Sequence, residues 1–486
     1  MRTRSVSPFV RVITTILVLL IGFSCSVNPV TGKKELMLMT EEQEIALGIQ
    51  SDPEIVSSFG EYKDPALQAF ITAKGMEMTK ISHRPELSYH FKILDSPVVN
   101  AFALPGGYVY FTRGIMAHFN NEAAFAGVLG HEIGHITARH GARQYSSQMV
   151  GQLGLVLGIV LSQDFAQFAD LASNALGILF LKFSRDHETE SDRLGVEYST
   201  KIGYDAREMA GFFQTLKRLS GEQGAIPTFL STHPDPVDRY ANVTKLATEW
   251  QQKVPTSDLK VERNAYLRMI DGIVYGSDPR QGYVENDIFY HPEMRFQFPT
   301  PGGWKMENMA SQVQFTPADG KALLLMDLAA EKDLMEAATA ALGKDSLTAV
   351  EGPKRTSVQG LNAVSVLAEQ TNAQKNVAIR IQIYLIQYND AIYRFYGMAY
   401  KQDFDAFKKL FLHTMQSFKP LDDYSKINVR PERLRIREVT GTAAFSDAMQ
   451  EMRIPQDKWK ELAILNEMEL NSPVQKGQLI KVLVKE

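Results

Sequence analysis

A nearly continuous run of apolar residues at 123–136 is the clearest feature of the hydrophobic pattern. Asn120 and Asn121 before it are favourable helix N-caps, and Glu122 places negative charge in the first turn. Gly141 is expected to end the helix. Glycines weaken a helix interior, so we expect another backbone to pack closely against the three at positions 127, 130 and 134. The pattern predicts a mostly buried helix.

The hydrophobic pattern changes period in the C-terminal half. Apolar and polar residues alternate there as in half-buried strands, at 296–298, 313–315, 379–385 and 392–396. The last two segments are separated by Asn389-Asp390 and predict a hairpin. Helical character is found at 331–342 and 404–418. We therefore predict an α+β domain at 286–422, in which no chemical motif stands out.

The first 24 residues have the pattern of an export signal. Three arginines precede an apolar run at 12–23, which is too short to cross a bilayer comfortably. Cys25 follows at once, and it is the only cysteine, so an intrachain disulfide is excluded. We interpret 1–24 as a signal peptide.

Two more apolar runs, 150–161 and 176–181, flank a polar stretch. Neither reaches the roughly 20 residues of a transmembrane helix, so we expect two helices joined by a turn. They form either part of the core or a lid that contacts a membrane or a partner.

Length and charge bound the domain count and the partners. The 486 residues are enough for about three domains. A net charge of −4 and a pI of about 6.3 leave no basic footprint for nucleic acid. We expect a first domain at 25–255, a connector at 256–285 that is helical through 266–275, and a small last domain at 430–486.

The predicted buried helix contains the pentapeptide HEIGH at 131–135. Helix positions four apart differ in direction by about 40°, so His131 and His135 can reach one metal ion from the same face. This is the pattern of zinc hydrolases, in which Glu132 would act as general base on a water. Two ordinary buried histidines are the alternative, but the spacing favours zinc. His140 points to the opposite side of a continuous helix, and we interpret it as a helix C-terminal cation.

Catalytic zinc usually has three protein ligands, so a third ligand is sought downstream. Glu188 and Asp192 are one helical turn apart and share a face. One carboxylate suits zinc as a ligand, and a neighbouring one suits the orientation of a ligand imidazole. Spacing alone leaves the choice of the third ligand open, because acidic pairs are common on solvated helices. Glu190, in the same segment, is an alternative ligand.

HEIGH followed by SRDHETESD at 184–192 resembles the zinc metallopeptidases of the HtpX and CAAX-prenyl-protease type, and above all their soluble periplasmic BepA-like branch. The resemblance implies a mainly α-helical zincin domain of the gluzincin type with a small sheet, within an α+β multidomain chain. It also implies one zinc ion (Zn2+) per chain. The resemblance implies that His131, His135 and Glu188 are the ligands. It further implies that Glu132 is the general base and that Asp192 is the orienting acid.

Two further segments resemble the same family. Asn100, Ala101 and Phe102 begin a stretch that resembles the strand at the edge of the substrate cleft, where main-chain hydrogen bonds could hold an extended peptide. A structural hairpin is the alternative. His233 lies in a Ser-Thr-His-Pro sequence that resembles the loop capping the open metal position, and Arg239 follows it. A purely structural turn explains His233 equally well.

The two ends of the chain carry two more resemblances. Residues 22–25 resemble a bacterial lipoprotein signal, which implies a lipid anchor on Cys25; an incidental cysteine after a signal peptide is the alternative. Residues 430–486 resemble a LysM module that closes at 474–482, although Thr440-Gly-Thr442 replaces the usual opening. The module implies a βααβ fold. It leaves peptidoglycan binding open against an interaction module without sugar affinity.

The leading hypothesis is a zinc-dependent endopeptidase of the bacterial cell envelope. It would hydrolyse misfolded or unassembled envelope proteins in the periplasm, with its lipid anchor in the outer membrane. The alternative is a chaperone-like or scaffold protein, in which binding dominates over proteolysis. The first hypothesis depends on the zinc ligands, and the second on the accessory domains.

Overall fold

The computed structural model describes residues 25–147, 183–223, 228–233, 239–254, 258–344, 347–372 and 377–486. These residues form two compact units. The first lies within Met1–Val56, Glu61–Gly276 and Arg433–Val484, and the second within Ser57–Gly60, Ser277–Glu432 and Lys485–Glu486. The two helices expected at 150–161 and 176–181 lie outside the described residues. No helix in the described part of the chain is long and apolar enough to cross a membrane.

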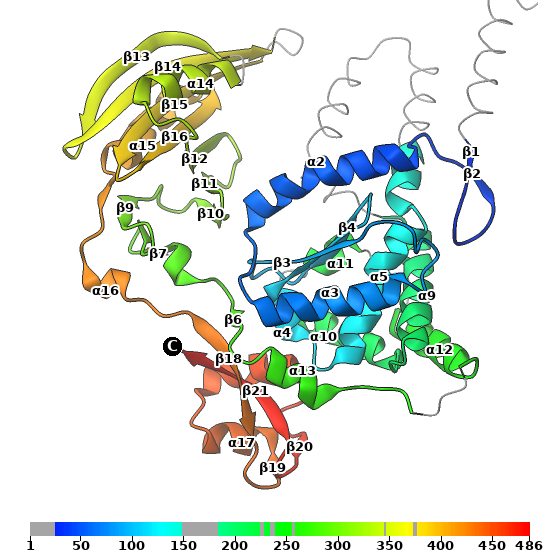
Figure 1. Ribbon diagram of the computed structural model, residues 1–486. Coiled ribbons are helices and arrows are strands. Elements are labelled where there is room, and N and C mark those ends of the chain that lie inside the picture. The colour runs from blue at the N-terminus through cyan, green and yellow to red at the C-terminus, as the bar shows by residue number, and fades with distance from the viewer. Residues whose placement is uncertain are drawn as a thin grey trace, which may run out of the picture. The chain divides into compact units, whose positions relative to one another are not determined.

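The first unit combines helices with small sheets (Figure 1). Its helices are α2 (Glu41–Phe59), α3 (Pro65–Thr79), α4 (Arg113–His118), α5 (Glu122–Thr137), α9 (Arg185–Lys201), α10 (Arg207–Gln223), α11 (Thr228–Thr232), α12 (Arg239–Gln251), α13 (Arg263–Met269), α17 (Phe445–Glu451), the 3-10 turn η2 (Gln456–Lys458) and α18 (Trp459–Leu465). Its strands are β1 (Cys25–Val27), β2 (Lys34–Leu36), β3 (His90–Leu94), β4 (Ala101–Leu104), β5 (Tyr108–Thr112), β6 (Val274–Tyr275), β18 (Glu432–Glu438), β19 (Ala443–Ala444), β20 (Pro473–Val474) and β21 (Leu479–Lys485).

A three-stranded sheet, in the order β3-β5-β4, places β4 at its edge. Strand β5 runs parallel to β3 and antiparallel to β4. The turn between β4 and β5 needs Gly107, which has a φ of +99° and whose added Cβ would lie 2.1 Å from the carbonyl oxygen of Ser88. The strand expected near residues 100–102 is therefore β4, and it lies at the edge of this sheet.

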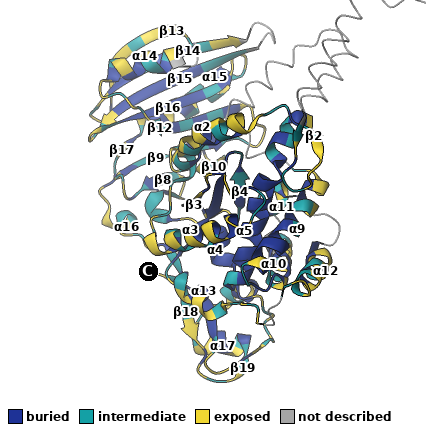
Figure 2. Cartoon of the chain, turned by 45° about the vertical axis from the view of Figure 1, so that its right-hand side comes forward, coloured by how far each residue is buried: buried dark blue, intermediate teal, exposed yellow. Residues whose placement is uncertain are grey.

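The predicted buried helix is α5, and it is confirmed. Asn121 caps it, because the side-chain oxygen accepts a hydrogen bond of 2.8 Å from the backbone of Ala124. Every residue from Ala123 to Thr137 is buried (Figure 2). A Cβ added at Gly130 would lie 3.0 Å from the Cα of Gly195 in α9. The helices α5 and α9 can thus approach closely only because both positions are glycines.

The predicted end of this helix is wrong. Helix α5 ends at Thr137, and a new helix starts at His140. Between them Arg139 has a φ of +55°, a conformation that is uncommon for a residue with a side chain. Hydrogen bonds from its guanidinium to Glu44 (3.1 Å) and to the carbonyl of Met39 (2.9 Å) hold it there. His140 is therefore not a C-terminal cation: it is buried, and burial lowers its pKa.

The helical connector predicted through 266–275 is also wrong in its second half. Helix α13 ends at Met269, and Gly272 follows with a φ of +94°. Strand β6 then joins a sheet in the order β21-β18-β6. The backbone of Gly272 donates to Leu434, and that of Leu434 donates to Ile273, at 2.8 and 2.9 Å. The connector segment is thus part of a sheet with the C-terminal strands.

The last segment of the first unit, 433–484, has the predicted strand–helix–helix–strand order, and its identity as a LysM-like module stays a prediction. Its most buried contact with the rest of the unit is made by Lys481. The ammonium group donates to the carbonyls of Ala117 (3.0 Å), Phe119 (2.8 Å) and Leu465 (3.1 Å). Because Ala117 and Phe119 immediately precede α5, the module helps to hold the start of that helix.

Burial lowers the pKa of Lys481 to about 7, whereas an unfolded lysine titrates near about 10.4. Between these values the unfolded chain binds more protons than the native chain, so this group makes stability rise with pH. We expect the denaturant midpoint of the wild type to increase from pH 7 to 10 more steeply than that of Lys481→Met. Parallel pH profiles for the two proteins would contradict the shifted pKa.

The second unit is rich in sheet, and the predicted α+β character is confirmed. Its elements are η1 (Pro279–Gln281), β7 (Tyr283–Glu285), β8 (Ile288–His291), β9 (Phe296–Pro299), β10 (Lys305–Asn308), β11 (Gln312–Thr316), β12 (Ala322–Leu328), α14 (Leu334–Lys344), β13 (Thr348–Val358), β14 (Leu361–Asn372), β15 (Val377–Tyr388), β16 (Ala391–Tyr400), α15 (Phe404–Gln416), β17 (Lys419–Pro420) and α16 (Tyr424–Ile427).

A seven-stranded antiparallel sheet, in the order β10-β11-β12-β16-β15-β14-β13, carries two apolar layers. Alternation along β15 sends Ile381 and Ile383 into a cluster with α14. Tyr384 and Ile386 belong to the other cluster, which includes α15. The helices α14 and α15 therefore cover opposite faces of the sheet, as the period of two in the sequence requires. The predicted hairpin is formed by β15 and β16.

Candidate metal centre

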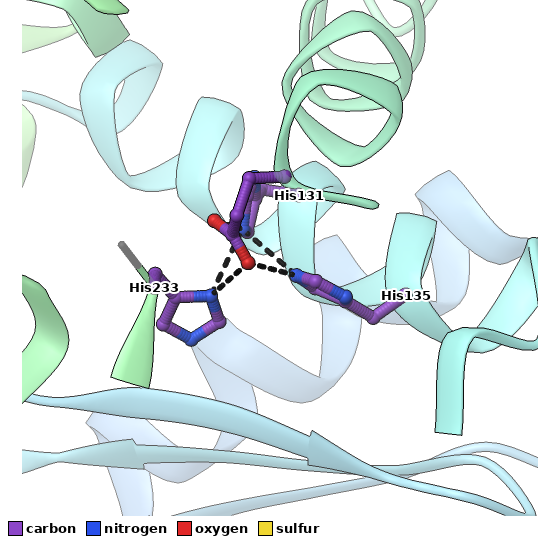
Figure 3. A group of neighbouring side chains, drawn as sticks. His131, His135 and His233 are labelled. Carbon is purple, nitrogen blue, oxygen red and sulfur yellow. Dashed lines mark hydrogen bonds and ion pairs between the residues drawn. The ribbon is translucent and has the colours of Figure 1, made fainter. Parts of the chain in front are cut away.

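Four buried side chains converge in the first unit. Three of them are histidines, which are labelled in Figure 3. His131 and His135 come from α5, Glu188 from α9, and His233 from the residue after α11. Their ligand atoms all lie within 4.8 Å of one another. Residues separated by about 100 positions in the sequence are thus brought to one point.

The distances within this cluster suit a shared cation. Nε2 of His131 is 3.0 Å from Nε2 of His135 and 3.3 Å from Nδ1 of His233. Oε1 of Glu188 is 3.0 Å from Nδ1 of His233 and 3.5 Å from Nε2 of His135. Oε2 of Glu188 is buried without a hydrogen-bond partner. Imidazole nitrogens with one carboxylate are a typical zinc donor set, so the residues present fit the metal expected from the sequence.

The electrostatics of the cluster favour positive charge at its centre. Burial alone would lower the pKa of His131, but hydrogen bonds to Asp192 and Glu188 outweigh it and raise the pKa to about 9. Burial alone would raise the pKa of Glu188, but His233 and His131 hold it well below its usual value. The carboxylates therefore keep their negative charge in a buried site and stabilise a cation beside them.

Glu132 lies next to the cluster and has no hydrogen-bond partner on either carboxylate oxygen, both of which are buried. Nε2 of His233 lies 3.7 Å from Oε1 of Glu132. Burial raises the pKa of Glu132, which makes the carboxylate a stronger base than an exposed one. An unpaired, buried carboxylate costs stability, so its presence here indicates a role in chemistry.

Asp192 and Arg239 orient His131 from behind. Oδ1 of Asp192 is 2.9 Å from Nδ1 of His131. The guanidinium of Arg239 donates to both carboxylate oxygens of Asp192, at 2.6 and 2.8 Å, and lies 4.1 Å above the ring of Phe213. Because the carboxylate accepts from Nδ1, the opposite nitrogen of His131 is directed into the cluster with its lone pair free when the ring is neutral.

A cleft beside the cluster is bordered by the edge strand β4. Phe102 lines it, together with His135, Phe183 and His233. Ala101 is fully buried and does not line the cleft. Asn100 does not line it either, and its side-chain oxygen is buried. Of the three residues expected to bind substrate, the structure places only Phe102 at the cleft.

The geometry of α9 distinguishes the two candidate glutamates, Glu188 and Glu190, and the sequence spacing already contains this geometry. Glu188 and Asp192 are four residues apart in α9 and face the cluster together. Glu190 is two residues from either, which rotates it by about 200°. It contacts His140 instead. Sequence reasoning also missed Phe183, whose ring stacks on His135 with 4.1 Å between centroids.

The segment that holds these side chains is similar to known proteases. Residues 65–247 match the profile of peptidase family M48. Glu132 and the four clustered residues all lie within this M48 region.

Relatives of the chain extend the similarity. The beta-barrel assembly-enhancing protease of Yersinia pestis is 28% identical over 259 residues, which are 51% of this chain and 52% of that protein. The protein of the same name from Escherichia coli is 29% identical over 224 residues, 44% of this chain and 46% of that protein. Mitochondrial metalloendopeptidase OMA1 of Arabidopsis thaliana is 36% identical over 155 residues, 32% of this chain and 30% of that protein.

The matched stretch covers about half the length of the two beta-barrel assembly-enhancing proteases and 30% of the Arabidopsis protein. The M48 match and the BepA-like relatives confirm the resemblance found in the motifs at the level of the peptidase family. The family match and the names of the relatives support a metalloendopeptidase.

Proposed function

We propose that this protein is a zinc-dependent endopeptidase of the bacterial cell envelope that cleaves misfolded or unassembled proteins. The observation that carries the proposal is the buried cluster of His131, His135 and Glu188 beside Glu132, whose carboxylate has no hydrogen-bond partner. Metal ligands next to an unpaired base are the minimum equipment for hydrolysis of an amide by water.

The roles of the residues follow from their positions. His131, His135 and Glu188 would hold zinc, which when bound supplies Lewis acidity toward a scissile carbonyl and toward water. Glu132 takes a proton from the attacking water and passes it to the leaving amine. Burial raises the pKa of Glu132, which suits a group that must both accept and release a proton near neutral pH. No covalent intermediate with the protein is needed.

His233 and Arg239 have supporting roles in the proposal. Nδ1 of His233 lies 3.3 Å from His131 and 3.0 Å from Glu188, so the imidazole would cap the position that substrate needs. Arg239 acts through Asp192, which it fixes against His131. Substrate binding would therefore have to displace His233, while Arg239 stays in place.

An extended polypeptide is the substrate form that the cleft suits. Strand β4 has a neighbour on one side only within the described sheet, so a peptide can add to its other side by main-chain hydrogen bonds. Such recognition reads backbone rather than side chains, and it requires a segment that is not already folded. Relatives named beta-barrel assembly-enhancing protease support envelope proteins as the source of these segments.

The proposed location is the periplasm, with a lipid anchor on Cys25 in the outer membrane. Support comes from the apolar run at 12–23 and the cysteine that follows it. Cys25→Ser should release the protein from the membrane fraction of a producing cell, and fractionation with labelled palmitate checks this. Peptidoglycan binding by the C-terminal module is not part of the proposed function.

Removal of the metal tests the proposal directly. Purified protein treated with phenanthroline should lose cleavage of denatured casein, because Glu132 alone cannot polarise the scissile carbonyl. One equivalent of zinc should restore cleavage, whereas magnesium should not, since imidazole ligands do not suit it. Circular dichroism of the treated protein controls for unfolding. Cleavage that persists in folded, metal-depleted protein would refute the assignment.

A further inference from the structure

A series of polar contacts starts at Nδ1 of His135, whereas Nε2 of the same ring lies near His131 and Glu188. Nδ1 of His135 lies 3.0 Å from Nδ1 of His140. Nε2 of His140 lies 3.1 Å from a carboxylate oxygen of Glu190, and the same oxygen accepts a hydrogen bond of 2.7 Å from Arg143. Both histidines are buried, and Glu190 is largely buried. The contacts thus run from a candidate metal ligand to a carboxylate on α9.

The hydrogen positions along these contacts follow from the groups involved. The carboxylate of Glu190 forms an ion pair with the guanidinium of Arg143, at 2.7 Å. Glu190 is therefore ionised and can only accept. The hydrogen of His140 must then lie on Nε2. In the neutral imidazole only one ring nitrogen carries a hydrogen, so Nδ1 of His140 keeps a free lone pair and accepts.

This arrangement determines the tautomer of His135. Since Nδ1 of His140 accepts, Nδ1 of His135 must carry the hydrogen. Nε2 of His135 then has a free lone pair, and it is this nitrogen that lies 3.5 Å from Glu188 and 3.0 Å from Nε2 of His131. A metal ion binds only a ring nitrogen without hydrogen. The contacts behind His135 therefore leave the correct nitrogen free.

The two histidines of HEIGH are oriented by different groups. His131 contacts the carboxylate of Asp192 directly, at 2.9 Å. Among the described contacts of His135, Nδ1 meets the imidazole of His140, and the carboxylate of Glu190 lies one step further away. The ring of His140 is itself confined, because His187 stacks on it with 4.4 Å between centroids.

We propose that His140, supported by Glu190, is a positioning residue that holds His135 in its metal-binding tautomer and orientation. The inference rests on the proposed zinc site. It assigns a purpose to the break in the helix at Arg139, since a continuous helix would carry His140 to the opposite side. Ser191, whose hydroxyl is 3.2 Å from Nδ1 of His140, can rotate to donate to the same lone pair and does not change the assignment.

Zinc affinity of the full-length protein tests this inference, measured by competition with a chromophoric chelator. His140→Leu removes the acceptor, and we expect the zinc Kd to rise by about 10–100-fold, as for other groups that orient a metal-bound histidine. His140→Asn places Oδ1 where the imidazole has Nδ1, and it should restore affinity close to that of the wild type. The visible spectrum of the cobalt-substituted proteins should change for leucine and not for asparagine.

Glu197→Gln is the matched control, because Glu197 lies on α9 and pairs with Arg193 and Lys201 away from the site. It should leave zinc affinity unchanged. The inference would be overturned if His140→Leu bound zinc as tightly as the wild type. It would also be overturned if His140→Leu and His140→Asn lost the same amount of zinc affinity. If His140→Leu does not fold, Glu190→Ala at its partly exposed position takes its place and must weaken zinc binding. A wild type that binds no zinc overturns the proposed function itself.

Discussion

Glu132→Gln is expected to lower the rate of protein cleavage by about 10²–10⁴-fold, the usual contribution of a general base. Glutamine has nearly the shape of glutamate but cannot accept a proton from water at neutral pH. Glu132 makes no hydrogen bond within the described residues, so the substitution breaks no hydrogen bond and should not destabilise α5. Zinc should remain bound, because the three proposed ligands are unchanged. Cleavage of denatured casein and metal analysis of the same preparation check both expectations.

Glu122→Gln is the matched control for this variant. Glu122 lies on the same helix, where it accepts a hydrogen bond from Tyr204 that a glutamine oxygen can also accept. Cleavage by this control should equal that of the wild type. Undiminished cleavage by Glu132→Gln would remove the glutamate from the mechanism. Full rescue of an envelope-stress defect by the same variant would favour the chaperone-like alternative over proteolysis.

Lys481→Met is expected to cause a large loss of stability. The amino group of Lys481 is fully buried, and its nitrogen lies within hydrogen-bond distance of three backbone carbonyls, those of Ala117, Phe119 and Leu465. Methionine fills much of the volume but donates nothing. Each buried group left without a partner costs about 1–3 kcal/mol, so at pH 10, where the native amine is uncharged and no buried charge is removed with it, we expect the free energy of unfolding to fall by about 3–5 kcal/mol. Equilibrium denaturation of the full chain measures this.

Lys485→Met is the control for the same strand, since Lys485 is exposed in β21. A surface substitution of this kind changes stability by about 0.5 kcal/mol or less. The contacts of Lys481 also predict a loss of protease activity with the stability, because Ala117 and Phe119 lead directly into the capped start of α5. Equal stability of the two variants would show that the C-terminal module does not support the catalytic helix.

The sequence predicted the elements whose pattern is local. Helix α5 follows from an Asn cap and an apolar run, and the hairpin of β15 and β16 follows from alternation on both sides of Asn389-Asp390. The fate of 266–275 was not predictable in this way. Strand β6 exists because it pairs with β18, which lies far along the chain, and such pairing leaves no trace in local periodicity.

The candidate site was predictable to the extent that it depends on helical spacing. The positions of His131 and His135 in one cluster with Glu188 agree with that spacing, while their roles remain proposals. His140 could not be placed from the sequence, because its position depends on the left-handed conformation of Arg139. That conformation is held by Glu44 and Met39, both about 100 residues earlier. A long-range contact therefore determines this local turn. Arginine disfavours a positive φ, so its own conformational preference predicted a continuous helix instead.

The central claim is that one zinc ion is bound by His131, His135 and Glu188 next to Glu132. X-ray absorption at the zinc edge, combined with metal analysis of the purified full-length protein, tests it most directly. We predict one zinc per chain with nitrogen and oxygen ligands and no sulfur, and a drop to substoichiometric zinc in Glu188→Ala but not in Glu197→Gln. Stoichiometric zinc in Glu188→Ala, or a wild type without zinc, would contradict the account.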